Sequence, residues 1–406
     1  PVSAKLADAP VGLFRFAQLA GRNMLEVIPV ETLRQTYLRG PLNIHYICDP
    51  DIVTELLVGE GRGFPKAKFT KDIIGSAVGN GLILSEGEKW RRQRQRYSPL
   101  FAARNLPVLS AYFAETGMEV GDSLARHAGP VDFVQVAPAA TLANISRVMF
   151  SGTADVTSEQ IRAGLIRYFE FISKLSLFDV MGLPAWVPRK KWLRSKAPVT
   201  TMRDLGRHVI ETRRAERRAE PVDFLDFLIE AVDNDFEDIE TTGDNLLTFV
   251  VAGHETSANA IAWGFYLLAI DLWTQDRIRE EVLSVRPEGP ITYDDVQRMP
   301  LLHAHVQETL RLYPSAAFFA RDAGREIEVK GVTFREGDAL FFPVYSLHRN
   351  EALWEDPAEY RPERFIEGTF PRGQYIPFGD GPRICIGAQY ALTEIKILMA
   401  SVLRRV

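Results

Sequence analysis

A long apolar segment, residues 244–270, constrains the possible folds of this chain more than any other feature. Its hydrophobic pattern predicts one helix of about 27 residues, which would be about 40 Å long. A helix that is apolar on nearly every side has to be buried, because none of its faces is suited to water. We therefore expect this helix to cross the interior of the protein.

Helical periodicity dominates the rest of the chain, and strands are predicted only in short runs. Further helices are expected at residues 50–57, 90–101, 106–128, 158–177, 198–219, 222–232, 274–285 and 301–312. Strands are expected at residues 44–47, 316–320, 326–332 and 339–344. This pattern predicts a mainly α fold with a small β-rich lobe.

The composition is that of an ordinary soluble globular protein. The 406 residues are 46% hydrophobic and 25% charged, with a formal net charge of −5, so nothing suggests binding to nucleic acid. No internal repeat or Gly/Ser-rich linker interrupts the sequence. We expect a single domain that spans residues 1–406.

Cysteine content and hydropathy bear on where the protein works. Two cysteines, Cys48 and Cys385, are too few for a disulfide scaffold and indicate a reducing compartment, which predicts a cytoplasmic location. No run of 18 or more apolar residues predicts a membrane span. The chain begins at Pro1 and stops at Val406. These ends are compatible with a missing leader, C-terminal segment or fused reductase.

Cys385 lies in a glycine-rich loop just before a helical pattern, whereas Cys48 ends a strand-like run and is expected in the core. A thiol binds a metal as the thiolate, and the positive end of a following helix lowers its pKa. Backbone N–H groups of a tight turn, formed by Gly379, Gly381 and Gly387, act in the same direction. Cys385 is thus a candidate metal ligand. The alternative is a buried cysteine beside a helix start.

The loop resembles the haem-binding loop of the cytochrome P-450 family, of the soluble bacterial type. Its five motif positions are matched by Phe378, Gly381, Arg383, Cys385 and Gly387. The resemblance implies the fold of that family, with haem b (iron protoporphyrin IX) between a long central helix and the cysteine loop. It also implies Cys385 as the proximal iron ligand, and Phe378, Gly379 and Gly387 as residues that bind the cofactor.

The middle of the long helix contains polar residues that resemble the oxygen-activating motif of the same family. Ala252 and Gly253 lie one turn before Thr256, and their small size would leave room for a diatomic ligand. By resemblance, Thr256 hydrogen-bonds the bound oxygen or a helix carbonyl, and Glu255 delivers protons. The alternative is structural: Thr256 and Ser257 would bond back to the preceding turn and bend the helix.

Further residues match positions that support the cofactor in this family. Glu308, Arg311 and Arg364 would form a buried network behind the cysteine loop, with a role in assembly rather than chemistry. The haem propionates need cationic or N–H partners. The residues at matching positions are Trp90, Arg94, Arg321 and Arg383. Taken singly, each arginine would more often be a solvated surface residue.

The resemblance also implies substrates and partners. Residues 69–78, 168–178 and 315–319 would line a pocket for an apolar small molecule, with Phe318 and Phe319 as the strongest candidates. A basic face with Arg92 and Arg96 would receive an acidic ferredoxin or flavodoxin. No flavin- or nicotinamide-binding motif is found in these residues, so the electrons are expected from a separate chain.

The resemblance implies a haem-thiolate monooxygenase that inserts one oxygen atom from O2 into an apolar organic substrate. A peroxide-driven peroxygenase is one alternative, but such enzymes generally lack the Glu255 and Thr256 pair. A non-enzymatic haem-thiolate sensor is another alternative, because it would not need proton delivery. The sequence identifies neither the substrate nor the electron donor.

Overall fold

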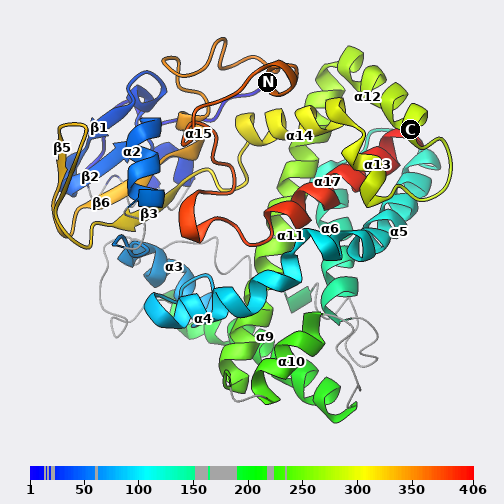
Figure 1. The fold of residues 1–406 in the computed structure, drawn as a ribbon, viewed down its shortest axis with the longest axis horizontal. Coiled ribbons are helices and arrows are strands. Elements are labelled where there is room, and N and C mark those ends of the chain that lie inside the picture. Colours follow the sequence, from blue (N-terminus) through cyan, green and yellow to red (C-terminus); the bar gives the residue numbers. More distant parts are fainter. Residues whose placement is uncertain are drawn as a thin grey trace. The chain divides into compact units, whose positions relative to one another are not determined.

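The computed structural model describes residues 1–12, 15, 18–19, 23–59, 63–150, 163–164, 190–216, 224–233 and 236–406 (Figure 1). The chain divides into two compact units. Unit 1 comprises Pro1–Gly75, Ile172–Leu193 and Gln307–Ile386, and unit 2 comprises Ser76–Phe171, Arg194–Val306 and Gly387–Val406. The residues predicted to form a single domain are therefore described below as two compact units.

Helices dominate the described residues, as the sequence predicts. They are α2 (Pro50–Thr54), α3 (Lys68–Val78), α4 (Gly87–Tyr97), α5 (Leu106–Ala125), α6 (Phe133–Phe150), α9 (Lys190–Glu216), α10 (Phe224–Asp233), α11 (Ile239–Ile270), α12 (Leu272–Val285), α13 (Tyr293–Gln297), α14 (Pro300–Leu312), α15 (Val344–Leu347), α16 (Arg364–Glu367) and α17 (Ala388–Leu403). The strands are β1 (Tyr37–Arg39), β2 (Ile44–Ile47), β3 (Phe319–Asp322), β4 (Ile327–Val329), β5 (Val332–Phe334) and β6 (Ala339–Phe342).

The strands belong to unit 1 and form a four-stranded sheet and a hairpin. The sheet has the order β1-β2-β6-β3, with β2 and β6 parallel and the other neighbouring pairs antiparallel. The expected strand 326–332 is instead the hairpin of β4 and β5, because Lys330 (φ 50°) and Gly331 (φ 75°) reverse the chain. Residues at positive φ end a strand whatever the hydrophobic pattern around them.

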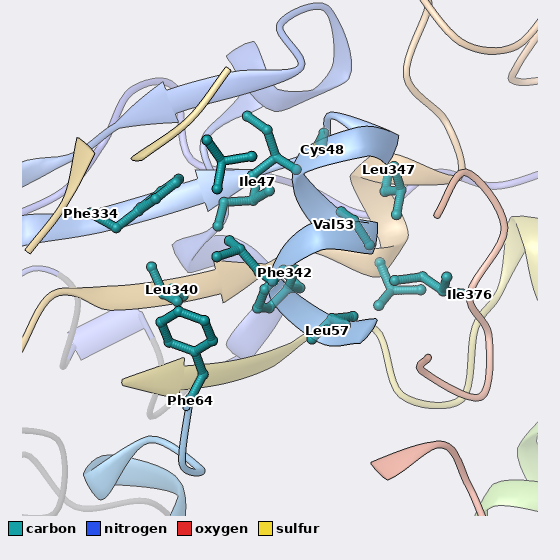
Figure 2. Packing of buried hydrophobic residues seen from close by; sticks show 14 of the residues in the cluster. Ile47, Cys48, Val53, Leu57, Phe64, Phe334, Leu340, Phe342, Leu347 and Ile376 are labelled. Atoms are coloured by element: carbon teal, nitrogen blue, oxygen red, sulfur yellow. The ribbon is translucent and has the colours of Figure 1, made fainter. Parts of the chain in front are cut away.

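One face of the sheet carries the main apolar cluster of unit 1. Figure 2 shows Cys48, Val53, Phe342, Leu347 and Ile376 in this cluster, contributed by segments far apart in the sequence. Cys48 is fully buried, as predicted for a core residue, and this burial raises the pKa of its thiol.

Unit 2 is built around α11, which packs against α6 and α17, and α17 in turn packs against α5 (Figure 1). The predicted buried helix is confirmed, but it begins at Ile239, five residues before Asp244. Asp238 caps it by accepting a hydrogen bond from Thr241 N–H at 2.6 Å. Its first turn is polar, so hydrophobic periodicity alone placed the start too late.

Other differences from the expected elements have local causes. The helix α6 was not expected, and it contains Pro138, a residue that normally ends a helix. The expected helix 90–101 ends as α4 at Tyr97 and continues as a 3-10 turn, Ser98–Phe101, with Pro99 in its first turn. The expected helix 158–177 lies almost entirely outside the described residues. Among those described, no helix combines the length and the apolar character needed to cross a bilayer.

Candidate active site

The cysteine loop of unit 1 is closed by two backbone hydrogen bonds. Gly379 N–H donates to the Ile376 carbonyl oxygen at 3.0 Å, and Cys385 N–H donates to the Phe378 carbonyl oxygen at 2.9 Å. Between them the chain turns through Gly379 and Gly381, which have φ of 74° and 72°. Cys385 is exposed at the end of this turn and is not in a disulfide. A thiol in this position is available to a metal.

Gly381 is required by space as well as by conformation. A Cβ atom there would lie 2.0 Å from the carbonyl oxygen of Leu57, which belongs to the helical turn Glu55–Gly59. The turn was expected to need Gly387 too, but Gly387 has φ of −93°, which other residues adopt readily, and it forms the N-cap of α17. The turn thus depends on Gly379 and Gly381.

Asp380 is a further loop residue that the sequence did not single out. Its carboxylate accepts a hydrogen bond from Gly381 N–H at 2.6 Å and two from the Arg372 guanidinium at 2.9 and 3.0 Å. The bond from Arg372 is the main cause that lowers the pKa of Asp380. A charged pair thereby holds the turn from outside. Asp380 lies within the cysteine-loop motif and was visible in the sequence, but its pairing with Arg372 could be seen only in the structure.

The predicted network behind the loop is confirmed. Arg311 forms two bonds to the Glu308 carboxylate, at 2.7 and 2.8 Å, and Arg364 Nε donates to Glu308 Oε1 at 3.1 Å. Glu308 and Arg311 are fully buried, and Arg364 is 6% exposed. A buried carboxylate with this many donors is fully compensated, whereas loss of one partner would leave a charge uncompensated.

The oxygen-motif residues lie on α11 in unit 2, where one stripe of the helix is exposed. Ala252, Glu255, Thr256 and Asn259 are exposed at helical spacing, while Ser257, Ala258 and Ala260 are buried. An exposed polar stripe in the middle of a buried helix needs a reason other than packing. Asn259 was missed by the sequence analysis, although its spacing of three residues from Thr256 was visible.

Thr256 and Glu255 have different environments within this stripe. Thr256 Oγ1 donates to the Ala252 carbonyl oxygen at 2.6 Å, which is one of the two bonds that the structural alternative requires; the buried Ser257 hydroxyl does not make the other. The surrounding protein partly desolvates the Glu255 carboxylate and raises its pKa. A carboxyl group with a raised pKa is a better proton donor near neutral pH than an ordinary glutamate.

The neighbours of this pair contact α6. A Cβ atom on Gly253 would lie 3.1 Å from Ile145 Cδ1, so a larger side chain there would require Ile145 to move. Thr141 Oγ1, also on α6, donates to the His254 carbonyl oxygen at 3.0 Å and lies 3.1 Å from His254 Nδ1. Of the two small residues expected to leave room for a ligand, only Ala252 lies on the exposed stripe.

The four expected propionate partners are divided between the units. Trp90 and Arg94 of α4 in unit 2 are four residues apart and both half-buried. Arg383 of unit 1 is half-buried in the short turn Gly381–Arg383. Arg321 was expected after a strand but lies within β3, where its backbone forms an isolated antiparallel β-bridge with that of Lys66. Each is placed on a regular element or a defined turn.

Comparison with known proteins decides the family. The model of the cytochrome P-450 family matches residues 35–406. Similar proteins include cytochrome P-450 3A12 of Canis lupus familiaris, which is 27% identical over 88% of this chain and 75% of the relative. Cytochromes P-450 3A5 and 4F2 of Homo sapiens are 28% and 29% identical over 90% of this chain and 76% of each relative.

The chain belongs to the cytochrome P-450 family. It is therefore an oxidoreductase of the monooxygenase class that binds haem b, and it requires dioxygen, an organic substrate and a redox partner. Its mainly helical structure with a small sheet region agrees with the P-450 fold.

The residues of this cytochrome P-450 suit haem in three respects. Haem needs an axial ligand for its iron, and Cys385 is an exposed thiol at the end of a turn that backbone hydrogen bonds close. It needs cations for its propionates, and the half-buried Arg94, Arg321 and Arg383 are of that kind. It also needs a helix face that the protein core leaves uncovered, and α11 offers one at Ala252 and Thr256.

The expected docking face of the cytochrome P-450 is partly occupied. Arg96 Nη2 lies 2.8 Å from Glu230 Oε2 of α10, and the Arg92 guanidinium lies 5.0 Å from the centroid of the Phe236 ring. Both contacts lie within unit 2, and the ion pair with Glu230 compensates part of the charge of Arg96. Arg96 thus has an acidic partner within unit 2, Arg92 stays exposed, and docking of an electron donor at this face stays a prediction.

The expected substrate segments are described only in part. Residues 168–178 lie outside the described part of the chain. The Phe318 and Phe319 rings stack on Phe341 and Phe342 of β6, with centroid distances of 5.0 and 4.9 Å. These contacts attach both rings to the sheet of unit 1, as ordinary core residues would be.

Proposed function

We propose that this monooxygenase holds haem through Cys385 and inserts oxygen into an apolar organic substrate. One observation carries the proposal: Cys385 is exposed at the end of a defined turn. The turn is closed by the hydrogen bond from Cys385 N–H to the Phe378 carbonyl oxygen, and Gly379 and Gly381 adopt positive φ within it. A turn of this kind fixes the direction of the sulfur atom. The network of Glu308, Arg311 and Arg364 in the same unit supports the proposal, because it is the buried ion network that the family resemblance implies for the support of the cysteine loop.

Phe378, Gly379 and Gly387 would complete the surroundings of the cofactor, and Trp90, Arg94, Arg321 and Arg383 would bind its propionates. The guanidinium groups donate paired hydrogen bonds to carboxylates, and the Trp90 indole donates one. The half-buried position of each side chain supports this role, since a propionate there would be partly shielded from water.

Haem, when bound, supplies the iron centre at which dioxygen is reduced. The proposed task of the chain is to deliver protons to that centre. Glu255 would hold a proton on its carboxylate, and its raised pKa supports this. Thr256 would present its hydroxyl on the exposed stripe of α11 beside Ala252, where its oxygen is held by the Ala252 carbonyl. The small Ala252 side chain leaves this face accessible.

The substrate class, the electron donor and the location are further parts of the proposal. Apolar side chains in the candidate segments support an apolar small molecule as the substrate. A ferredoxin or flavodoxin is the proposed donor. The presence of only two cysteines in 406 residues supports a cytoplasmic location.

The reduced, CO-bound absorption spectrum tests the ligand. The variant Cys385→Ala should lose the spectrum of a thiolate-ligated haem, because no sulfur would be bound to the iron. Cys48→Ala is the matched control: it also removes one cysteine, but from the core of unit 1, and it should keep that spectrum. An unchanged spectrum in Cys385→Ala would refute the assignment.

A further inference from the structure

His348, which directly follows α15, joins two parts of unit 1 that the proposed function uses. Its carbonyl oxygen accepts a hydrogen bond from Arg311 Nη1 at 2.9 Å, and its imidazole Nε2 accepts one from Ile376 N–H at 2.9 Å. The residue is fully buried. His348 therefore contacts the buried ion network through its backbone and the base of the cysteine loop through its side chain.

The bond to Ile376 fixes the form of the imidazole. A backbone N–H can only donate, so Nε2 must be the acceptor and the neutral ring must carry its proton on Nδ1. Burial, with the positive charge of Arg311 as a smaller cause, lowers the pKa of His348 to about 3. The ring is thus a neutral acceptor at neutral pH.

Ile376 is the fixed point from which the loop leaves the core. Its side chain packs in the apolar cluster of unit 1 (Figure 2), and its carbonyl oxygen accepts from Gly379 N–H at 3.0 Å. The next bond in the series closes the loop, from Cys385 N–H to the Phe378 carbonyl oxygen at 2.9 Å. His348 Nε2 satisfies the Ile376 N–H at the start of this series.

We propose that His348 is a positioning residue: it holds the Ile376 peptide and thereby sets the position of the Cys385 thiolate against the Glu308–Arg311–Arg364 network. The proposal rests on the proposed function, in which Cys385 binds the haem iron. Without an acceptor, the Ile376 N–H would be buried and unsatisfied, which is costly enough to displace a peptide. A displaced Ile376 would move the carbonyl that closes the turn at Gly379.

The neighbouring Tyr375 offers a matched control. Its ring lies 5.0 Å from the His348 ring, but its hydroxyl donates to the carbonyl and side-chain oxygens of Gln307, at 2.9 and 2.8 Å. Tyr375→Phe therefore removes hydrogen bonding one residue before Ile376 and keeps the ring contact. The Ile376 N–H remains paired with His348 in that variant.

The test compares wild-type holoenzyme with three variants by amide hydrogen exchange at Ile376, Gly379 and Cys385 and by the reduced, CO-bound spectrum. His348→Phe keeps a ring and loses the acceptor, and it should speed exchange at Ile376 by about tenfold or more. It should also convert part of the CO complex from the thiolate-ligated to the thiol-ligated spectrum. His348→Gln, whose carboxamide oxygen reaches the place of Nε2, should restore the wild-type exchange rate at Ile376 and the thiolate-ligated spectrum. Tyr375→Phe should change neither the exchange rate nor the spectrum.

Should His348→Phe fail to fold, His348→Asn replaces it, because its shorter carboxamide cannot reach the Ile376 N–H. The proposal is overturned if His348→Gln behaves like the variants that lack the acceptor, or if those variants exchange and absorb as wild type does. Failure of the proposed function looks different: Cys385→Ala would leave the CO spectrum unchanged, while exchange at Ile376 would still depend on the residue at position 348.

Discussion

Among single residues, Thr256 is compatible both with a structural role in α11 and with a role in proton delivery. Its hydroxyl bonds to the Ala252 carbonyl at 2.6 Å, as a purely structural threonine would, yet it lies on the exposed stripe of a buried helix. Thr248 makes the same kind of bond in the same helix, to the Asp244 carbonyl at 2.7 Å, but is buried. Comparing Thr256 with Thr248 therefore distinguishes the effect of the hydrogen bond, which both residues make, from the effect of exposure, which only Thr256 has.

We predict that Thr256→Ala lowers the fraction of consumed dioxygen that appears as oxygenated product by about tenfold. Its effect on stability should be small, because the lost bond is worth about 1 kcal/mol. Thr248→Ala loses a similar bond and should couple oxygen to product as wild type does. Product yield per dioxygen is the measurement, and equal yields in Thr256→Ala and wild type would contradict a role of Thr256 in proton delivery.

Individual residues also show what a sequence can and cannot reveal. The spacing around Cys385 was sufficient to predict the turn, since Gly379 and Gly381 both have positive φ. Gly253 was assigned to the oxygen site because of its place in a motif, whereas its contact with Ile145 depends on how α6 packs against α11. Contacts between elements distant in sequence are set by the fold and leave no local signal.

At the scale of elements, α17 carries a buried carboxyl group toward the other helices of unit 2. Glu394 is 1% exposed, accepts a hydrogen bond from Asn144 of α6 at 2.9 Å, and has its pKa raised by burial to about 7. The folded state thus favours the protonated acid, while the unfolded chain has the ordinary glutamate pKa of about 4.3. Its contribution to stability is complete below the unfolded pKa and is lost as pH rises through the folded pKa.

We predict that wild type loses about 3 kcal/mol of unfolding free energy through this group between pH 4.5 and pH 7. Glu394→Gln, which cannot ionise, should lose correspondingly less over the same range. Denaturant unfolding at several pH values measures the slope. Glu280→Gln, which removes an exposed carboxylate from α12, should keep the wild-type slope. A Glu394→Gln slope equal to that of wild type would contradict the raised pKa.

Element boundaries were predicted well where hydrophobic periodicity sets them and poorly where other forces do. The buried middle and the end of α11 at Ile270 follow the apolar pattern, but its start depends on the Asp238 cap. The helix α6 continues past Pro138 because it packs against α11 and α5, and this packing outweighs the cost of about 3 kcal/mol of a proline inside a helix. Strand β2 was predicted with its observed bounds, Ile44–Ile47.

At the scale of the whole chain, segments far apart in sequence meet at Arg311. Besides Glu308, its guanidinium donates to the carbonyl oxygens of His348, Pro357 and Glu359, at 2.8 to 2.9 Å. The sequence predicted the ion network by family resemblance. It did not predict these carbonyl contacts, because they involve backbone atoms whose position depends on the complete fold.

We predict that Arg311→Lys lowers the free energy of unfolding by about 3 kcal/mol or more and reduces haem content. A single ammonium group keeps the charge but cannot satisfy the Glu308 carboxylate and three carbonyl groups together. Arg361→Lys is the control, since its ion pair with Glu355 is exposed and worth less than about 1 kcal/mol. Equal losses in the two variants, by denaturant unfolding, would contradict a special role for the buried network.

X-ray absorption at the iron edge of the purified holoenzyme tests the central claim most directly, because it reports the atoms bound to the metal. If Cys385 is the ligand, wild type and Cys48→Ala should show a sulfur scatterer in the first coordination shell of the iron, and Cys385→Ala should lack it. A sulfur scatterer that persists in Cys385→Ala, or one that is absent from wild type, would contradict the account.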